Sequence, residues 1–242
     1  MSATSGGFLG RPHLHHRLCD STNTLAKELA NAGAVHGTTV TASEQTGGRG
    51  RQGRAWVAPA GSALLMSVIV RPLQPQHQLA PLAAGLAVAE TCEALTGVSC
   101  TIKWPNDVWI EQRKVAGILV EAKADQTAEK SWAVIGIGLN TSVDLAAMPE
   151  ELRTTATTLG LPAETNALPT LISRLEFWTQ RSPRDVIAAW RQRDALLGRQ
   201  ISWSAGSGTA AGVDDNGNLL VQSADGQVQA LNAGEVHLSV EL

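Results

Sequence analysis

The sequence changes character at Gly198, and this change limits the possible folds more than any other feature. Before Gly198, apolar residues at helical spacing alternate with short runs of β-branched residues, which predicts a domain containing both helices and strands. After it, short alternating runs are separated by turn sequences at 215–217 and 225–226, which predicts about five strands in a small barrel. We therefore expect an α+β domain over residues 1–197 and a second, β-only domain over residues 198–242.

Local patterns locate the elements of the first domain. Ser21 or Asn23 can cap a helix, and the Ser-Pro-x-Asp sequence that starts at Ser182 is typical of the start of another. Helices are predicted at 21–31, 79–97, 168–178 and 182–198, and strands at 38–42, 63–70, 99–103, 108–110, 115–122 and 132–139. We interpret residues 1–20 as a loosely ordered lead-in. Its histidines are interpreted as solvated rather than metal-binding, because no cysteine or carboxylate accompanies them at ligand spacing.

Composition excludes several classes of protein. With 242 residues and a net charge of −3, the chain can bury a core but has no overall positive field that would hold DNA or an acidic membrane. The uncharged run at 55–70 has 16 residues, too few to span a membrane. The start of the chain lacks the apolar stretch of a signal peptide, and the three cysteines show no Cys-x-x-Cys spacing. We expect a soluble, cytoplasmic protein without a DNA or membrane partner.

The segment 46–56 is rich in glycine and arginine and has no apolar periodicity, so it is predicted to be a loop. Arg49, Arg51 and Arg54 alternate with glycines, and such a loop can wrap charged and backbone donors around a phosphate or carboxylate. Trp56 can stack on a nucleobase. A flexible basic surface loop with nonspecific nucleic-acid contacts explains the composition about equally well.

The sequence Lys-Trp-Pro-Asn-Asp at 103–107 predicts a rigid bend between two strands, because the proline disfavours a helical conformation at the residue before it. Such a bend can present its polar side chains to a site. The alternative is an ordinary turn in which Asn106 and Asp107 bond their own backbone. Lys114 starts an apolar strand nearby, and its ammonium points either to solvent or into a cleft.

Three common site motifs are absent. Glycines at 136 and 138 begin a G-x-G-x-x-G pattern, but position 141 is threonine, so the dinucleotide-binding motif fails. The segment 47–54 contains no P-loop signature. No G-x-S-x-G sequence supports a Ser-His-Asp triad.

Five blocks, taken together in this order, resemble the biotin protein ligases. The blocks are 21–23 (Ser-Thr-Asn), 48–56, 103–107, 114–119 (Lys-Val-Ala-Gly-Ile-Leu) and 136–140 (Gly-Ile-Gly-Leu-Asn). They extend over residues 21–140, and the predicted C-terminal barrel stands where this family has one. Val115 departs from the leucine that the family often has. Only 20 residues precede Ser21, so the chain resembles the ligase-only class rather than members with an N-terminal DNA-binding domain.

The resemblance implies a fold and a reaction. The expected fold is α+β: a mixed sheet with helices mainly on one face, as in class II synthetases and biotin ligases, followed by an SH3-like β-barrel. The implied enzyme joins biotin and ATP, with Mg²⁺ on the phosphates, into biotinyl-5′-AMP and pyrophosphate. It then transfers biotin to one lysine of a biotin carboxyl carrier domain, as in acetyl-CoA carboxylase.

Two alternatives stay open at this point. A lipoate ligase or octanoyltransferase shares the domain, but the Gly-Arg-rich loop disfavours both. A noncatalytic biotin binder is disfavoured by the arginine and lysine set, because a binder of biotin alone has no phosphate to neutralise.

The resemblance also implies roles for individual residues. Biotin contacts are implied for Ser21, Thr22, Asn23, Gln45, Gly48, Arg49, Gly117, Leu119, Gly136 and Gly138. Nucleotide contacts are implied for Arg49, Arg51, Arg54, Trp56, Lys103, Asn106, Lys114 and Asn140. Arg51 and Lys114 are expected to hold the reacting carboxylate and phosphate, and Asp107 to accept the proton of the incoming lysine. No set of protein metal ligands is predicted.

Overall fold

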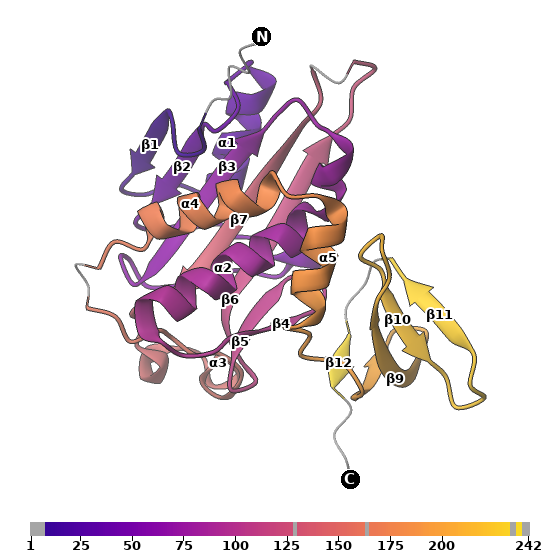
Figure 1. Ribbon diagram of the computed structural model, residues 1–242. Helices are drawn as coiled ribbons and strands as arrows, with labels where there is room; N and C mark the ends of the chain where they lie inside the picture. Colours follow the sequence, from indigo (N-terminus) through magenta and orange to yellow (C-terminus); the bar gives the residue numbers. More distant parts are fainter. Residues whose placement is uncertain (1–7, 128–129, 163–164, 233–235, 239–242) are drawn as a thin grey trace.

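The computed structural model describes residues 8–127, 130–162, 165–232 and 236–238. Its largest element is a seven-stranded sheet with the order β1-β2-β3-β7-β6-β5-β4 (Figure 1). The strands are β1 (His13–His16), β2 (Thr39–Ala42), β3 (Ala63–Val70), β4 (Thr101–Lys103), β5 (Asp107–Ile110), β6 (Arg113–Lys123) and β7 (Trp132–Asn140). Only the β1–β2 pair is parallel among these neighbours, so the prediction of a mixed sheet is confirmed.

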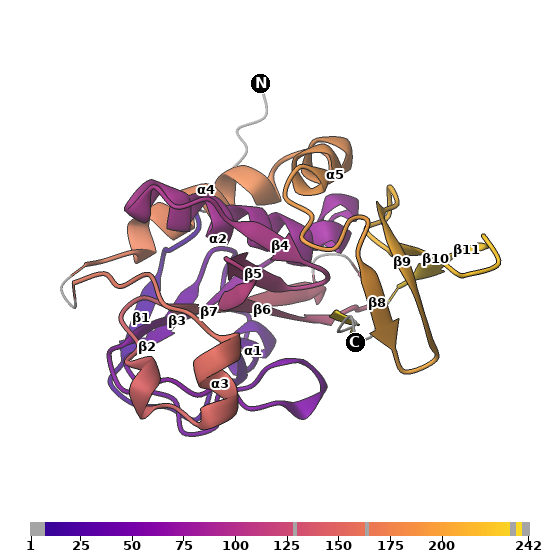
Figure 2. The same cartoon turned by 90° about the horizontal axis from the view of Figure 1, so that it is seen from below.

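Helices cover both faces of this sheet unequally. They are α1 (Thr22–Asn31), α2 (Ala80–Thr96), α3 (Glu150–Thr155), α4 (Leu168–Thr179) and α5 (Pro183–Arg191). Figure 2 shows α2, α4 and α5 on one face, with α1 and the short α3 on the other. Ser182 Oγ accepts a hydrogen bond from the Asp185 backbone N–H and Pro183 is the first helical residue, so the predicted start of α5 is confirmed. The predicted end at 198 is wrong, because α5 ends at Arg191.

The central helix α2 forms the middle of the main core. It packs against the sheet and against helices α4 and α5 beside it, which explains why it is apolar on almost every side. In the described part of the chain, the helical stretch 75–96 is long and apolar enough to cross a membrane, a feature that the uncharged run at 55–70 did not reveal. However, 67% of the apolar part of this stretch is buried inside the protein, as expected for a helix in a protein core.

The expectation of a loosely ordered lead-in is wrong for residues 13–16, which form β1 at the edge of the sheet. His13 Nε2 and His15 Nδ1 lie 2.7 Å and 2.9 Å from the same hydroxyl, Thr41 Oγ1 on β2. The polar sequence of β1 carries no apolar alternation, so the period-2 signal of a strand was missing. Among the described residues, no group of three histidine, cysteine or acidic side chains gathers as a metal site.

The polar connection after β7 also contains more structure than its sequence indicated. Residues Leu145–Ala147 form a 3₁₀ turn, and Glu150–Thr155 form α3. The six residues of α3 include one apolar side chain, Leu152, which is too few for a helical periodicity to be visible.

The C-terminal segment forms a second, antiparallel sheet with the order β11-β10-β9-β8-β12. Its strands are β8 (Gln200–Trp203), β9 (Gly206–Val213), β10 (Leu219–Gln222), β11 (Val228–Leu231) and β12 (His237–Leu238). It packs closely on the first domain, because one apolar cluster joins both parts and Trp104 Nε1 donates to Gly217 O at 2.9 Å. The domain boundary at residue 198 stays a prediction.

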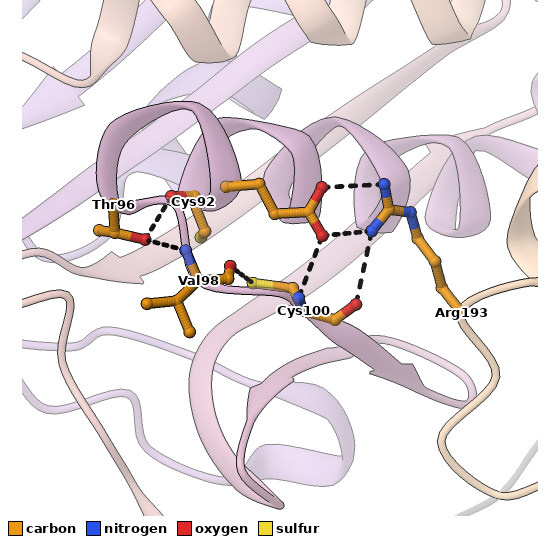
Figure 3. A network of polar contacts seen from close by, with 6 residues as sticks. Cys92, Thr96, Val98, Cys100 and Arg193 are labelled. Carbon is orange, nitrogen blue, oxygen red and sulfur yellow. Dashed lines mark hydrogen bonds and ion pairs between the residues drawn. The ribbon is translucent and has the colours of Figure 1, made fainter.

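An ion pair holds the segment that connects α5 to the C-terminal sheet against the first domain. Arg193, which follows α5, donates to the Glu93 carboxylate of α2, with Nη2 and Oε2 separated by 2.9 Å. The Cys100 backbone N–H donates to the same carboxylate at 3.0 Å (Figure 3). Ile102 of β4 exchanges backbone hydrogen bonds with Arg193 and Ala195, so the connecting segment extends the edge of the sheet.

Candidate active site

A cavity of about 590 Å³ lies at the N-terminus of α1 and is bordered by strands β3, β6 and β7. The loop after β2, the bend at 103–107, the region of α3 and residues 236–238 close its sides. Every residue to which the sequence assigned a role lines this cavity except Gly48. The blocks that resembled a ligase are therefore brought together around one space, whereas the roles of individual residues stay predictions.

Gly48 lies outside the cavity lining and holds the two arms of the arginine-rich loop together. Its carbonyl accepts a hydrogen bond from the Trp56 N–H at 2.9 Å. A Cβ at this position would lie 2.5 Å from Trp56 O and 2.9 Å from Gln45 Nε2, closer than side-chain carbons approach such atoms. Glycine is needed here because the two arms of the loop approach each other without room for a side chain.

The cavity floor is made of glycines on adjacent strands. Gly117 of β6 is paired with Gly138 of β7. The indole of Trp56 lies over both, since a Cβ at Gly138 would be 2.4 Å and one at Gly117 would be 3.1 Å from a ring carbon. Trp56 Nε1 is buried without a hydrogen-bond partner in the described structure. A floor without side chains therefore accommodates a flat group against the strand backbone.

Two charged residues meet at one wall. The β5–β6 hairpin places Lys114 Nζ 2.7 Å from Asp107 Oδ1, and their side chains are 34% and 21% exposed. The same ammonium lies 5.6 Å from the centre of the Trp56 ring. Lys114 therefore points into the cavity rather than to solvent, which decides between the two orientations that the sequence left open.

The bend at 103–107 is more than a self-contained turn. The Asn106 side chain donates to Ile118 O on β6 at 2.9 Å, and Asn106 O accepts from the Ile118 N–H at the same distance. Arg51 Nη1 lies 3.5 Å from Asn106 Oδ1. Asn106 thus fixes the bend to β6 and holds the arginine loop next to it.

The first turn of α1 faces the cavity from the other side. Gln45 Oε1 accepts hydrogen bonds from Thr22 N at 2.7 Å and Thr22 Oγ1 at 3.1 Å. Arg49 Nη2 donates to Thr24 Oγ1 at 2.6 Å, which ties the start of the loop to the same helix. Ser21 and Thr22 are both buried. Apart from Arg49, this side of the cavity presents neutral polar groups, in contrast to the charged wall opposite.

Two predicted ligand residues turn their amides inward. Asn23 Nδ2 donates to Glu121 Oε2 at 2.9 Å, and its Oδ1 accepts from Ser67 Oγ at 2.5 Å. Asn140 Nδ2 donates to Thr157 O at 2.9 Å. The ligand contacts of these two residues stay predictions, and in this structure their side chains hold neighbouring segments in place.

Some lining residues could not have been found from local sequence. Met148, Leu152 and residues 154–156 come from the region of α3, which had no visible periodicity. Residues 236–238 come from the C-terminal sheet, which reaches the cavity through packing between the two parts of the chain. Only long-range contacts bring these segments to the site.

Comparison with known proteins agrees with this geometry. Residues 15–140 match the biotin/lipoate A/B protein ligase family, and residues 203–239 match the biotin protein ligase C-terminal domain. The fold and the site therefore define a protein of the class that unites biotin and lipoate ligases.

Individual relatives narrow the class. The bifunctional ligase/repressor BirA of Bacillus subtilis is 33% identical over 246 residues, which cover 95% of this chain and 75% of that protein. The biotin–[acetyl-CoA-carboxylase] ligase of Mycobacterium tuberculosis is 33% identical over 238 residues, 89% of this chain and 85% of that one. The structure of the Aquifex aeolicus biotin protein ligase with biotin and ATP superposes with a TM-score of 0.77 at 26% identity, covering 95% of this chain and 100% of that one. The chain belongs to the biotin protein ligase family and is a ligase.

Proposed function

We propose that this protein forms biotinyl-5′-AMP from biotin and ATP and transfers biotin to a lysine of a biotin carboxyl carrier domain. The observation that carries the proposal is the cavity itself, which combines a side-chain-free floor, a neutral polar end at α1 and a wall with Arg51 and Lys114. A ligand with a compact bicyclic ring, a polar ureido head and a carboxylate fits this division, and the cations and the Trp56 ring suit a second, phosphate-bearing substrate.

In the first step, a biotin carboxylate oxygen attacks the α-phosphorus of ATP and pyrophosphate leaves. Both reactants are anionic, so their approach requires positive charge at the point of contact. We assign this to Arg51 and Lys114, and we assign the adenine contact to Trp56, whose ring is already at the floor. The Thr22 and Gln45 side chains are assigned to the polar head of biotin.

The Mg²⁺ that accompanies ATP has no dedicated protein site in this proposal. The described residues contain no cluster of acidic, histidine or cysteine groups for it, and Asp107 is paired with Lys114. We therefore assign the ion to the phosphate oxygens, and no step depends on a protein ligand for it.

In the second step, the acceptor lysine amine attacks the acyl carbonyl of the adenylate. The new amide bond forms as the bond to the phosphate oxygen breaks and AMP leaves. The amine must also lose a proton, and Asp107 is the proposed acceptor. Its ion pair with Lys114 has to loosen at this stage, because a carboxylate oxygen must come within hydrogen-bond distance of the amine to take its proton.

Two further features complete the proposal. The C-terminal antiparallel sheet closes into a small SH3-like barrel, and the protein acts in the cytoplasm. The second point is supported by its cysteines, all three of which are free thiols.

Exchange of labelled pyrophosphate into ATP tests the function directly. Biotin should support exchange, whereas lipoate and octanoate at the same concentration should not. An enzyme that works only with lipoate or octanoate, or a protein that binds biotin without exchange, would exclude this proposal. Addition of a biotin carboxyl carrier domain then tests transfer, with labelled biotin on one lysine as the expected product.

A further inference from the structure

A carboxylate below the cavity connects the sheet to the first two turns of α1. Glu121 lies on β6, two residues after Leu119, which lines the cavity. Its Oε1 is 2.5 Å from Lys27 Nζ, and its Oε2 accepts from Asn23 Nδ2 at 2.9 Å. Both partners are on α1, so one side chain holds the helix at two points. The sequence assigned no role to Glu121.

From Asn23 the contacts continue to the groups that face the cavity. Ser67 Oγ donates to Asn23 Oδ1 and also lies 2.8 Å from Thr22 Oγ1. Thr22 in turn holds Gln45 through its N–H and its hydroxyl. Ser67, Thr22 and Asn23 are all buried, so these contacts are shielded from competition by water. Gly136 leaves room for them, since a Cβ there would lie 2.0 Å from Asn23 Oδ1.

The contacts of Glu121 depend on its negative charge. Burial raises the pKa of Glu121, but hydrogen bonds from Lys27 and Asn23 and the charges of Lys27 and Arg49 outweigh it and hold the pKa below its usual range. Glu121 is therefore ionised at neutral pH and attracts cations on both α1 and the arginine loop. At the charged wall, Lys114 and Asp107 pair with each other instead.

We propose that Glu121 is a positioning residue that sets biotin affinity by fixing the first turn of α1 and, through Asn23, Ser67 and Thr22, the orientation of Gln45. The proposal rests on the function proposed above. It separates two effects: disturbance of this network weakens recognition of the polar head of biotin, whereas the cations that act on the reacting phosphate stay in place.

The test compares steady-state pyrophosphate exchange by Glu121→Gln and Lys27→Met with the wild type. Glu121→Gln keeps the size and an acceptor oxygen for Asn23 but removes the charge. We expect the KM for biotin to rise about fivefold in each variant, as for loss of a partly exposed charged contact, with kcat and the KM for ATP within about twofold of the wild type. Glu121→Ala, which removes the acceptor as well, should raise the KM for biotin further.

A matched control is Glu90→Gln. Glu90 is also a partly buried carboxylate that pairs with a cation, Arg174 at 3.5 Å, but this pair joins α2 to α4 on the other face of the sheet. It should leave all three kinetic constants unchanged. Thermal unfolding of every variant checks that each protein is folded at the assay temperature.

The outcomes separate the two proposals. A wild-type protein without biotin-dependent exchange overturns the proposed function and this inference with it. An active wild type whose Glu121→Gln and Glu121→Ala variants keep the KM for biotin overturns the inference alone. So does a loss of kcat without a change in KM, or an equal effect of Glu90→Gln, because either result would mean a general structural role.

Discussion

Replacement of Lys114 by alanine tests the centre of the proposed chemistry. The Lys114 ammonium is the group at the charged wall that both pairs with Asp107 and lies beside the Trp56 ring. If it stabilises negative charge that develops at the reacting phosphate, its removal should reduce kcat for pyrophosphate exchange about a hundredfold or more. A factor of one hundred corresponds to about 2.7 kcal/mol of transition-state stabilisation.

The same change should affect folding much less. The Lys114–Asp107 pair is partly exposed, so solvent screens it, and such pairs contribute about 0 to 1 kcal/mol to stability. For a chain of this length, the corresponding decrease in Tm is about 4 °C at most. A large kinetic effect with a small thermal effect is therefore the expected signature of a catalytic residue.

The assay measures biotin-dependent exchange and thermal unfolding on the same preparations. Arg113→Ala is the control, because Arg113 is the neighbouring cation on β6 and pairs with Glu111 at 3.6 Å, outside the cavity. It should retain wild-type kcat. If Lys114→Ala keeps exchange within about threefold of the wild type, or if Arg113→Ala loses as much, Lys114 has no direct part in adenylation.

Three further predictions concern the loop, the floor and the connection between the sheets. Trypsin should cut the arginines at 49–54 quickly in the free protein and slowly with biotin and MgATP, because the loop has few apolar groups to order it; equal rates would contradict this. Gly138→Ala puts a Cβ 2.4 Å from the Trp56 ring, so exchange should fall at least about tenfold and stability by about 2 kcal/mol, and an unchanged exchange rate would exclude the packed floor. Burial raises the pKa of Glu93, but hydrogen bonds from Arg193 and a backbone N–H outweigh burial and hold the pKa below its usual value. The ionised carboxylate therefore stabilises the fold at pH values above its unfolded-state pKa, and this stabilisation is lost as the pH falls through the folded-state pKa. Arg193→Met should flatten that acid-side loss in thermal unfolding, and an identical pH profile would show that the pair is not its source.

Much of the fold could be predicted because its elements carry their own periodicity. The helix α2 and the strands β3 and β7 are long and apolar, so local sequence was sufficient for them. The strand β1 and the helix α3 were missed because each is short and mainly polar. They form through contacts with distant residues, such as the hydroxyl of Thr41 for β1.

The sequence predicted which residues line the site better than it predicted how their side chains are oriented. The resemblance selected residues that line one cavity, since motif spacing reflects which strands and loops meet. It did not indicate that Asn23 turns towards Glu121 and Ser67, or that the Trp56 ring lies on Gly138. These orientations depend on residues that are 44 or more positions away along the chain, and no local pattern records them.

The charge of the protein limits how the site can act on its anionic substrates. The chain has a net charge of −3, whereas the described residues that line the cavity include five cations and one acidic residue, Asp107. At physiological ionic strength the field of such a cluster decays within about 8 Å, so it does not extend far beyond the cavity. Long-range steering of ATP is therefore weak, and the cations act after the substrate has entered. For this reason the loss of Lys114 should lower kcat more than it lowers the rate of ATP binding, which rapid-mixing measurements of the two rates can distinguish.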